Sequence, residues 1–161
     1  MRLAPLAWLP GSVVGLMKEV GRHLLRRPIV GIAVAARTDD GSWVLIRRGD
    51  TGTWALPGGT LEWGETLEVA MVRELEEEAG ITESKLLRVV GVYSRPDRDP
   101  RFHAVSVLVE ARVARPSKRQ LNGLEIAEIG VFADDAVPEP LAMTMSDFVA
   151  AVRKQDPTTL E

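Results

Sequence analysis

Three glutamates between positions 74 and 78 have the side-chain type and the spacing of a metal site. Glu74, Glu77 and Glu78 stand at i, i+3 and i+4, so a helix would project their carboxylates from one side. Like charges at this spacing repel, and no lysine follows at i+4 to relieve them. Oxygen ligands without Cys or His suit Mg²⁺ or Mn²⁺. The pattern predicts a divalent-cation site, and the alternative is a solvated acidic helix face.

The residues before these glutamates strengthen the metal interpretation. The run Pro57-Gly58-Gly59 places backbone without a Cβ where a carbonyl or amide can approach a metal or a phosphate, so Gly59 is a candidate ligand. Arg73 is placed to pair with Glu65 and to fix this loop against the helix, as residues behind a metal site often do.

The elements around the glutamates define the helix that must carry them. Thr66 is expected to cap a helix that runs to about Ala79 and stops at Gly80. Four apolar residues fall on the side opposite the carboxylates and are expected to pack against a sheet: Val69, Val72, Leu75 and Ala79.

The whole segment resembles a known motif. The pattern Gly59-x5-Glu65-x7-Arg73-Glu74-Leu75-x-Glu77-Glu78-x-Gly80-Ile81 resembles the complete Nudix box, without a departure. The resemblance implies an α/β fold, the αβα sandwich with a mixed sheet, over about residues 29 to 152. It also implies hydrolysis of a nucleoside diphosphate linked to a second group. Glu74, Glu77 and Glu78, often with the Gly59 carbonyl, would then hold Mg²⁺ or Mn²⁺, and Glu77 and Glu78 would serve catalysis.

A further carboxylate is expected outside the box. Members of the Nudix family often take a glutamate from a later loop as a base or a metal ligand. Glu125, with Glu128 close behind it, occupies the matching neighbourhood. Glu125 is therefore the candidate for a catalytic or fourth metal-binding carboxylate, and ordinary loop charge is the alternative.

The segment 93–103 concentrates arginines, aspartates and prolines. Guanidinium groups bind phosphate and carboxylates bind diols, so the segment suits a diphosphate carrying hydroxyl-rich sugars. A charged surface turn is the alternative, and a lone histidine is more often structural than functional. The candidate substrate contacts in this segment are Arg95, Asp97, Arg101 and His103.

Two more candidates precede the box. Arg47 and Arg48 follow a predicted strand, where neighbours point oppositely, so only one is expected to face the site; Arg47 is taken as the substrate contact. Trp54 could stack on a base or cover the pocket floor, and core packing is the alternative for this ring.

The loop at 93–103 also narrows the expected substrate. It resembles the loop of ADP-ribose and nucleotide-sugar pyrophosphatases of the family, in which a proline lies about 15 residues beyond the box, and Pro96 meets this spacing. Phe102 stands where that loop commonly has glycine. The resemblance implies cleavage of a nucleoside diphosphate sugar, ADP-ribose foremost. A triphosphate-sanitising pyrophosphatase and a catalytically idle nucleotide sensor are the alternatives.

The length of 161 residues fits one domain. We expect a Nudix domain at 29–155, an N-terminal helical extension at 1–28 and a C-terminal tail at 156–161. The first two strands should form a hairpin, and Ser146 should cap a last helix that buries Phe148, Val149 and Val152. Strands are expected at 29–36, 43–46, 86–93, 105–113 and 126–132, with a polar loop at 115–124.

Composition limits partners and location. The net charge is only −3, so no global field favours nucleic acid or an anionic membrane. The chain has no cysteine, which agrees with a cytoplasmic location. The apolar stretch 3–17 is interrupted by Pro5, Pro10 and Gly11 and is too short for a membrane anchor.

The N-terminal extension is expected to be a helix from Ser12 to about Arg26. Val13, Met17, Val20 and Leu24 recur at the spacing of one helical face. This face could cover its own domain or pack on a second subunit, so a homodimer is plausible.

Overall fold

The computed structural model describes residues 11–25, 27–116, 125–155 and 157–161. Most of the polar loop expected at 115–124 and Arg26, the expected helix end, lie outside the described residues. The helices are α1 (Gly11–Leu25), α2 (Leu67–Ala79) and α3 (Met145–Lys154). The strands are β1 (Ile29–Arg37), β2 (Trp43–Arg48), β3 (Trp54–Ala55), β4 (Ser84–Tyr93), β5 (Ala104–Val113), β6 (Ile126–Phe132) and β7 (Thr159–Leu160).

The strands form one mixed sheet in the order β3-β2-β1-β5-β4-β7, and β6 pairs with β2. β1 and β5 run parallel along the full length of β1, whereas β2 runs antiparallel to β3 and β6. The expected hairpin exists only at its turn, because β1 and β2 share the single pair Arg37 and Trp43. Beyond that pair the two strands take different neighbours.

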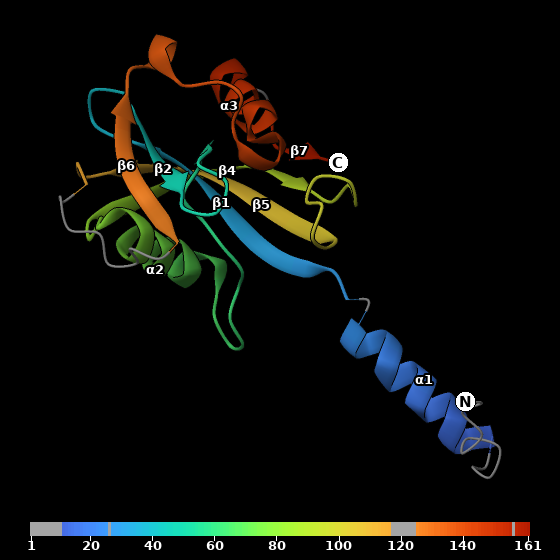
Figure 1. Cartoon of the computed structure of the whole chain (residues 1–161). Coiled ribbons are helices and arrows are strands. Elements are labelled where there is room, and N and C mark those ends of the chain that lie inside the picture. Colours follow the sequence, from blue (N-terminus) through green and yellow to red (C-terminus); the bar gives the residue numbers. More distant parts are fainter. Residues whose placement is uncertain (1–10, 26, 117–124, 156) are drawn as a thin grey trace.

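Two helices cover opposite faces of the sheet and give three layers (Figure 1). Ile32, Val34 and Ala36 of β1 belong to the core beneath α2. Ala33 and Ala35 belong to the core beneath α3, since successive side chains of a strand point to opposite faces. The αβα sandwich expected from the resemblance is thereby confirmed.

The ends of α2 follow the sequence prediction. The Thr66 hydroxyl accepts a hydrogen bond from the Val69 amide at 3.3 Å. Gly80 ends the helix in the left-handed region, at φ 62°, where glycine carries no Cβ penalty.

The predicted packing face of α2 is wrong at two positions. Val69 and Val72 are 56% and 40% exposed. The helix instead presents to the sheet the side that carries Glu74, so this carboxylate shares the buried side with the apolar residues. The buried residues of α2 are Ala70, Met71, Glu74, Leu75 and Ala79.

The last helix buries Phe148, Val149 and Val152, as predicted. Its N-cap is Thr144 rather than Ser146. Ser146 lies inside the first turn, where its hydroxyl accepts a hydrogen bond from the Leu141 amide at 3.2 Å.

The two ends of the chain behave differently. α1 begins one residue before Ser12 and projects from the start of β1 away from the sheet (Figure 1). Leu16, Met17 and Val20 are 64%, 54% and 48% exposed. In the part of the chain that the structure describes, no helix is long and apolar enough to cross a membrane. The segment expected as a tail contributes β7, which pairs in parallel with β4.

Candidate active site

A cavity of about 550 Å³ opens beside the first half of β1. Backbone of the 58–60 loop, acidic side chains of α2, and the segment 98–102 form its walls. The apolar side is closed by Met143 and, from α3, by Met145 and Phe148. The charged residues that line it are Arg48, Asp50, Glu74, Glu78, Arg98, Asp99, Arg101 and Glu125.

The loop before α2 is bonded to β1 like an additional strand. The Ile32 amide donates to the Gly59 carbonyl at 2.9 Å, and the Val34 amide donates to the Pro57 carbonyl at 2.8 Å. Gly58 has φ +147°, and a Cβ added there would lie 2.1 Å from the Ile32 oxygen. Side chains are therefore excluded here, and the loop backbone reaches the α2 carboxylates.

Glu74 meets this loop closely. A Cβ added at Gly59 would lie 2.3 Å from Glu74 Oε1. Glu74 is only 8% exposed, and burial raises the pKa of its carboxyl against the lowering effect of Arg73. The Arg73 guanidinium donates to Glu74 Oε1 at 2.8 Å.

Glu78 is the second carboxylate of the cavity wall. It accepts a hydrogen bond from the Gly58 amide at 2.8 Å. Burial raises its pKa to about 8, and the charges of Glu74 and Glu125 add to that increase. Glu74 and Glu125 therefore each disfavour the charged form of Glu78.

Glu77 lies differently. Its side chain is 53% exposed and its carboxylate is 3.4 Å from Arg73; it does not line the cavity. Among the described residues, no three acidic or histidine side chains converge as they would around one ion. The three glutamates of the motif are thus divided, with two facing the cavity and one facing solvent.

The ion pair expected between Arg73 and Glu65 is present. Arg73 Nε lies 2.9 Å from Glu65 Oε1, and a second nitrogen donates to Glu65 Oε2 at 3.0 Å. The same guanidinium donates to the Thr60 carbonyl at 3.1 Å. Arg73 lowers the pKa of Glu65, and Glu65 in turn raises the pKa of Arg73. Arg73 therefore joins the loop to the helix, in addition to the bond between the Gly58 amide and Glu78.

The donors at this end of the cavity are oxygens of the kind that a divalent cation takes, although the described side chains do not converge on one point. Glu74, Glu78 and Glu125 supply carboxylate oxygens, and Gly59 supplies a carbonyl whose second lone pair is available beside the Ile32 hydrogen bond. Mutually repelling, partly buried carboxylates gain most from a nearby cation. An all-oxygen donor set matches Mg²⁺ or Mn²⁺.

Arg48, rather than Arg47, lines the cavity. Arg47 donates to the Gly52 carbonyl at 3.0 Å and to Glu128 at 3.3 Å. The register between β2 and β6 shifts between Arg47 and Arg48, and such an irregularity redirects side chains. Arg48 forms a bidentate ion pair with Asp50, at 2.9 and 2.6 Å.

Trp54 packs away from the cavity. Its ring lies edge-on to Phe132, with centroids 4.9 Å apart, and it is not among the lining residues. The geometry matches the core-packing alternative for this ring.

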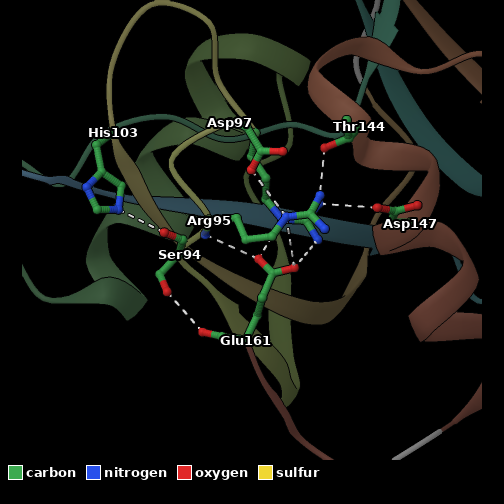
Figure 2. A network of polar contacts seen from close by, with 8 residues as sticks. Ser94, Arg95, Asp97, His103, Thr144, Asp147 and Glu161 are labelled. Carbon is green, nitrogen blue, oxygen red and sulfur yellow. Dashed lines mark hydrogen bonds and ion pairs between the residues drawn. The ribbon is translucent and has the colours of Figure 1, made fainter.

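Of the candidate substrate contacts in the 93–103 segment, one lines the cavity and three lie outside it. Arg101 lines the cavity and forms a bidentate pair with Asp99 at 2.9 and 2.7 Å, which lowers the pKa of Asp99. Arg95 and Asp97 lie outside the cavity and pair with each other at 3.3 Å. His103 is also outside, with Nε2 2.8 Å from the Ser94 carbonyl oxygen (Figure 2).

The sequence prediction missed Arg98 and Asp99, which are buried and line the cavity. Both lie in the segment that the arginine and aspartate content had singled out. No local signal distinguishes them from Arg95 and Asp97, because Arg98 is fixed by Glu161, 63 residues away.

Comparison with known proteins assigns the chain to a family. The profile of the NUDIX domain matches residues 25–152, and the chain belongs to the Nudix family. An ADP-ribose pyrophosphatase of Methanocaldococcus jannaschii is 49% identical over 72 residues, 43% of this chain and 42% of that protein. An ADP-ribose pyrophosphatase of Bacillus subtilis is 31% identical over 116 residues, 70% of this chain and 62% of that protein. The chain thus spans about half the length of these relatives.

Solved structures share the fold. A MutT NUDIX hydrolase from Burkholderia pseudomallei superposes with a TM-score of 0.64 at 32% identity, over 79% of this chain and 99% of that one. The NUDIX domain of Shewanella oneidensis NrtR complexed with ADP ribose gives a TM-score of 0.68 at 19% identity, over 88% of this chain and 97% of that one.

Proposed function

We propose that the chain hydrolyses the diphosphate bond of a nucleoside diphosphate sugar, ADP-ribose foremost, with Mg²⁺ or Mn²⁺ as cofactor. The products would be a nucleoside monophosphate and a sugar phosphate. The carrying observation is that one cavity brings Glu74, Glu78 and Glu125 together with Arg48 and Arg101. Carboxylates that hold a cation and guanidinium groups that bind phosphate are the two requirements of diphosphate cleavage.

The acidic end of the cavity would hold the cation through Glu74, Glu78 and the Gly59 carbonyl, and Glu125 lines the same cavity. Glu77 would join by turning from its exposed contact with Arg73, a type of ion pair that holds little energy. A bound divalent cation would neutralise phosphoryl charge and acidify the attacking water.

The residues of the chain itself can guide the proton and the charge. The attacking water oxygen forms a bond to one phosphorus, and the bridging oxygen leaves with the electron pair of the broken bond. Glu125 is the proposed acceptor of the proton lost by the water. Arg48 and Arg101, which line the cavity, would bind oxygens of the diphosphate and stabilise the negative charge that develops on the leaving oxygen.

The substrate choice is supported by relatives rather than by geometry alone. Both relatives described above are named as ADP-ribose pyrophosphatases, and the NrtR domain that shares the fold was solved with ADP ribose. The cavity is about 550 Å³, within the range of small-molecule sites.

The test is product analysis by chromatography and mass spectrometry. The panel contains ADP-ribose, UDP- and GDP-sugars, dinucleotides and oxidised nucleoside triphosphates, each with Mg²⁺ or EDTA. AMP and ribose phosphate formed only with Mg²⁺, and lost in Glu78→Gln, would support the proposal. Pyrophosphate released from triphosphates alone would replace it with a sanitising role. Binding of nucleotides without turnover would favour a sensor.

We also propose that the exposed apolar residues of α1 pack on a second copy of the chain. Leu16 and Met17 are more than half exposed, and a helix normally buries such a face. Light scattering on the full chain and on Leu16→Glu/Met17→Glu tests the homodimer; a monomeric mass for both would contradict it. The domain limits 29–155 and the cytoplasmic location stay predictions from the sequence.

A further inference from the structure

The segment 157–161 is built into the sheet next to the cavity-lining loop. Thr159 and Leu160 pair with Gly91 and Val92 of β4. The Thr158 hydroxyl donates to the Val89 carbonyl at 3.1 Å. The Glu161 amide donates to the Val92 carbonyl at 3.0 Å. This pairing carries Glu161 to the point where β4 ends and the loop begins.

Glu161 binds this loop through both its side chain and its backbone (Figure 2). Its Oε2 and Oε1 accept from Arg98 at 2.7 and 2.6 Å. Its carbonyl accepts from the Ser94 hydroxyl at 2.9 Å, and Oε2 accepts from the Arg95 amide at 3.3 Å. Arg98 holds the pKa of Glu161 at about 2. Glu161 is therefore an anion throughout the neutral range.

Arg98 has contacts besides those to Glu161, with two aromatic rings and two polar side chains. Its guanidinium lies 4.9 Å from the ring centre of Tyr93 and 5.4 Å from that of Phe148. A further nitrogen donates to Thr144 at 3.0 Å and to Asp147 at 3.3 Å. The bidentate bond to Glu161 fixes the plane of the guanidinium, and the rings stack on it.

The position of Arg98 also constrains the next residues of the loop. Arg98 and Asp99 are 9% and 8% exposed and both line the cavity, as does Arg101. Residues consecutive in a short loop cannot move independently. By fixing Arg98, the Glu161 carboxylate therefore also restricts the positions of residues 99–101, which complete this wall of the cavity.

We propose that Glu161 is a positioning residue for the substrate cavity, holding Arg98 so that the 98–101 wall keeps its shape for the anionic substrate. Residues 157–161 would then belong to the substrate site, although they lie beyond the 25–152 match to the family. The proposal rests on the proposed function, which makes this cavity the substrate site. Glu161 acts through Arg98 and does not touch the reacting atoms.

The kinetic test compares Glu161→Gln and Glu161→Ala with the full-length wild-type chain, using ADP-ribose and Mg²⁺. Loss of a hydrogen bond between charged groups predicts a KM raised about tenfold with kcat within about twofold. Added acetate should lower the raised KM of Glu161→Ala part of the way toward the wild-type value, because acetate can occupy the position of the missing carboxylate. The matched control is Asp39→Asn, which removes an exposed ion-pair carboxylate at the far end of β1 and should leave both constants unchanged.

A substrate-free measurement separates this inference from the proposed function. Tyr93 is the only tyrosine of the chain, and Arg98 lies over its ring. The ring resonances of ¹³C-tyrosine-labelled protein should shift in Glu161→Gln and stay unchanged in Asp39→Asn. Inactivity of the wild-type chain would contradict the proposed function, while the tyrosine signal still decides whether Glu161 holds Arg98.

Two outcomes would overturn the positioning role. One is a tyrosine spectrum identical in Glu161→Gln and wild type, which would show that Arg98 keeps its place without the carboxylate. The other is a shifted spectrum with KM unchanged or lowered, which would mean that Glu161 only ties β7 to the sheet or blocks the cavity.

Discussion

Arg73 donates a hydrogen bond of 2.8 Å to the buried carboxylate of Glu74, its immediate neighbour on α2. The same guanidinium holds Glu65 and the Thr60 carbonyl. The Arg73 side chain thus joins the loop, the helix and one of the two box carboxylates that face the cavity. Arg73 itself does not line the cavity, so it contacts Glu74 from outside the cavity wall.

Replacing Arg73 by alanine should therefore affect stability as well as activity. The buried Glu74 carboxylate would lose its partner, and leaving such a group unpaired costs about 1–3 kcal/mol. Urea unfolding should show this decrease. Arg112→Ala, which breaks an exposed pair with Asp39, serves as the control and should change stability by less than about 0.5 kcal/mol. Equal midpoints for the two variants would contradict the role given to Arg73.

Gly59→Ala should reduce turnover at least tenfold, because positioning errors of about 1 Å commonly cost more than this. The added Cβ would lie 2.3 Å from Glu74 Oε1, so the carboxylate must move. Steady-state kinetics and Mn²⁺ affinity measured by calorimetry should both decline. Gly15→Ala is the matched control, because nothing lies within 4 Å of its added Cβ. Normal Mn²⁺ affinity in Gly59→Ala would argue against Glu74 as a ligand.

Arg48→Ala should lower kcat/KM more strongly than Arg47→Ala. Arg48 lines the cavity, whereas Arg47 is occupied by Gly52 and Glu128 outside it. Loss of a charge-assisted contact to phosphate predicts a decrease of about tenfold or more for Arg48→Ala. The two variants remove the same side chain from adjacent positions, so each controls for the other. A larger decrease for Arg47→Ala would show that the substrate approaches from the opposite side of β2.

The contribution of Glu161 to stability should disappear in acid. Its folded pKa is about 2, below the ordinary value of 4.5, so the ion pair stabilises the fold above pH 4.5. This stabilisation is lost as the pH falls from about 4.5 to about 2. Urea midpoints of wild type and Glu161→Gln should therefore differ at pH 6, and the difference should shrink steadily as the pH falls toward 2. A constant difference across this range would show that the charge of Glu161 is not what stabilises the wild-type chain.

The local motif predicted the central part of this structure well. The limits of α2, its caps and the Arg73 contact with Glu65 all depend on residues within about twenty positions of one another. Short-range patterns specify such features, because helix periodicity and capping are local. The burial of Val69 and Val72 was predicted wrongly because the charge pattern does not show which side of a helix meets the sheet.

The arginines that line the cavity could not be predicted in the same way, because their positions depend on contacts between distant parts of the chain. A register shift at Arg47 and Arg48 redirects adjacent arginines, and strand alternation alone cannot show where such an irregularity falls. Similarly, Arg98 and Arg95 look equivalent in the sequence. Only the return of the chain at Glu161, with Phe148 from α3, buries one and leaves the other exposed.

The hydrogen bonds between the 57–61 loop and β1 allow the opening of the cavity wall to be measured through backbone amides. The amide protons of Ile32 and Val34 are bonded to the Gly59 and Pro57 carbonyls. Their exchange with deuterium therefore requires the loop to separate from β1, while neighbouring β1 amides require separation from β5. Comparison of these two exchange rates would measure how often the site opens in an otherwise folded molecule.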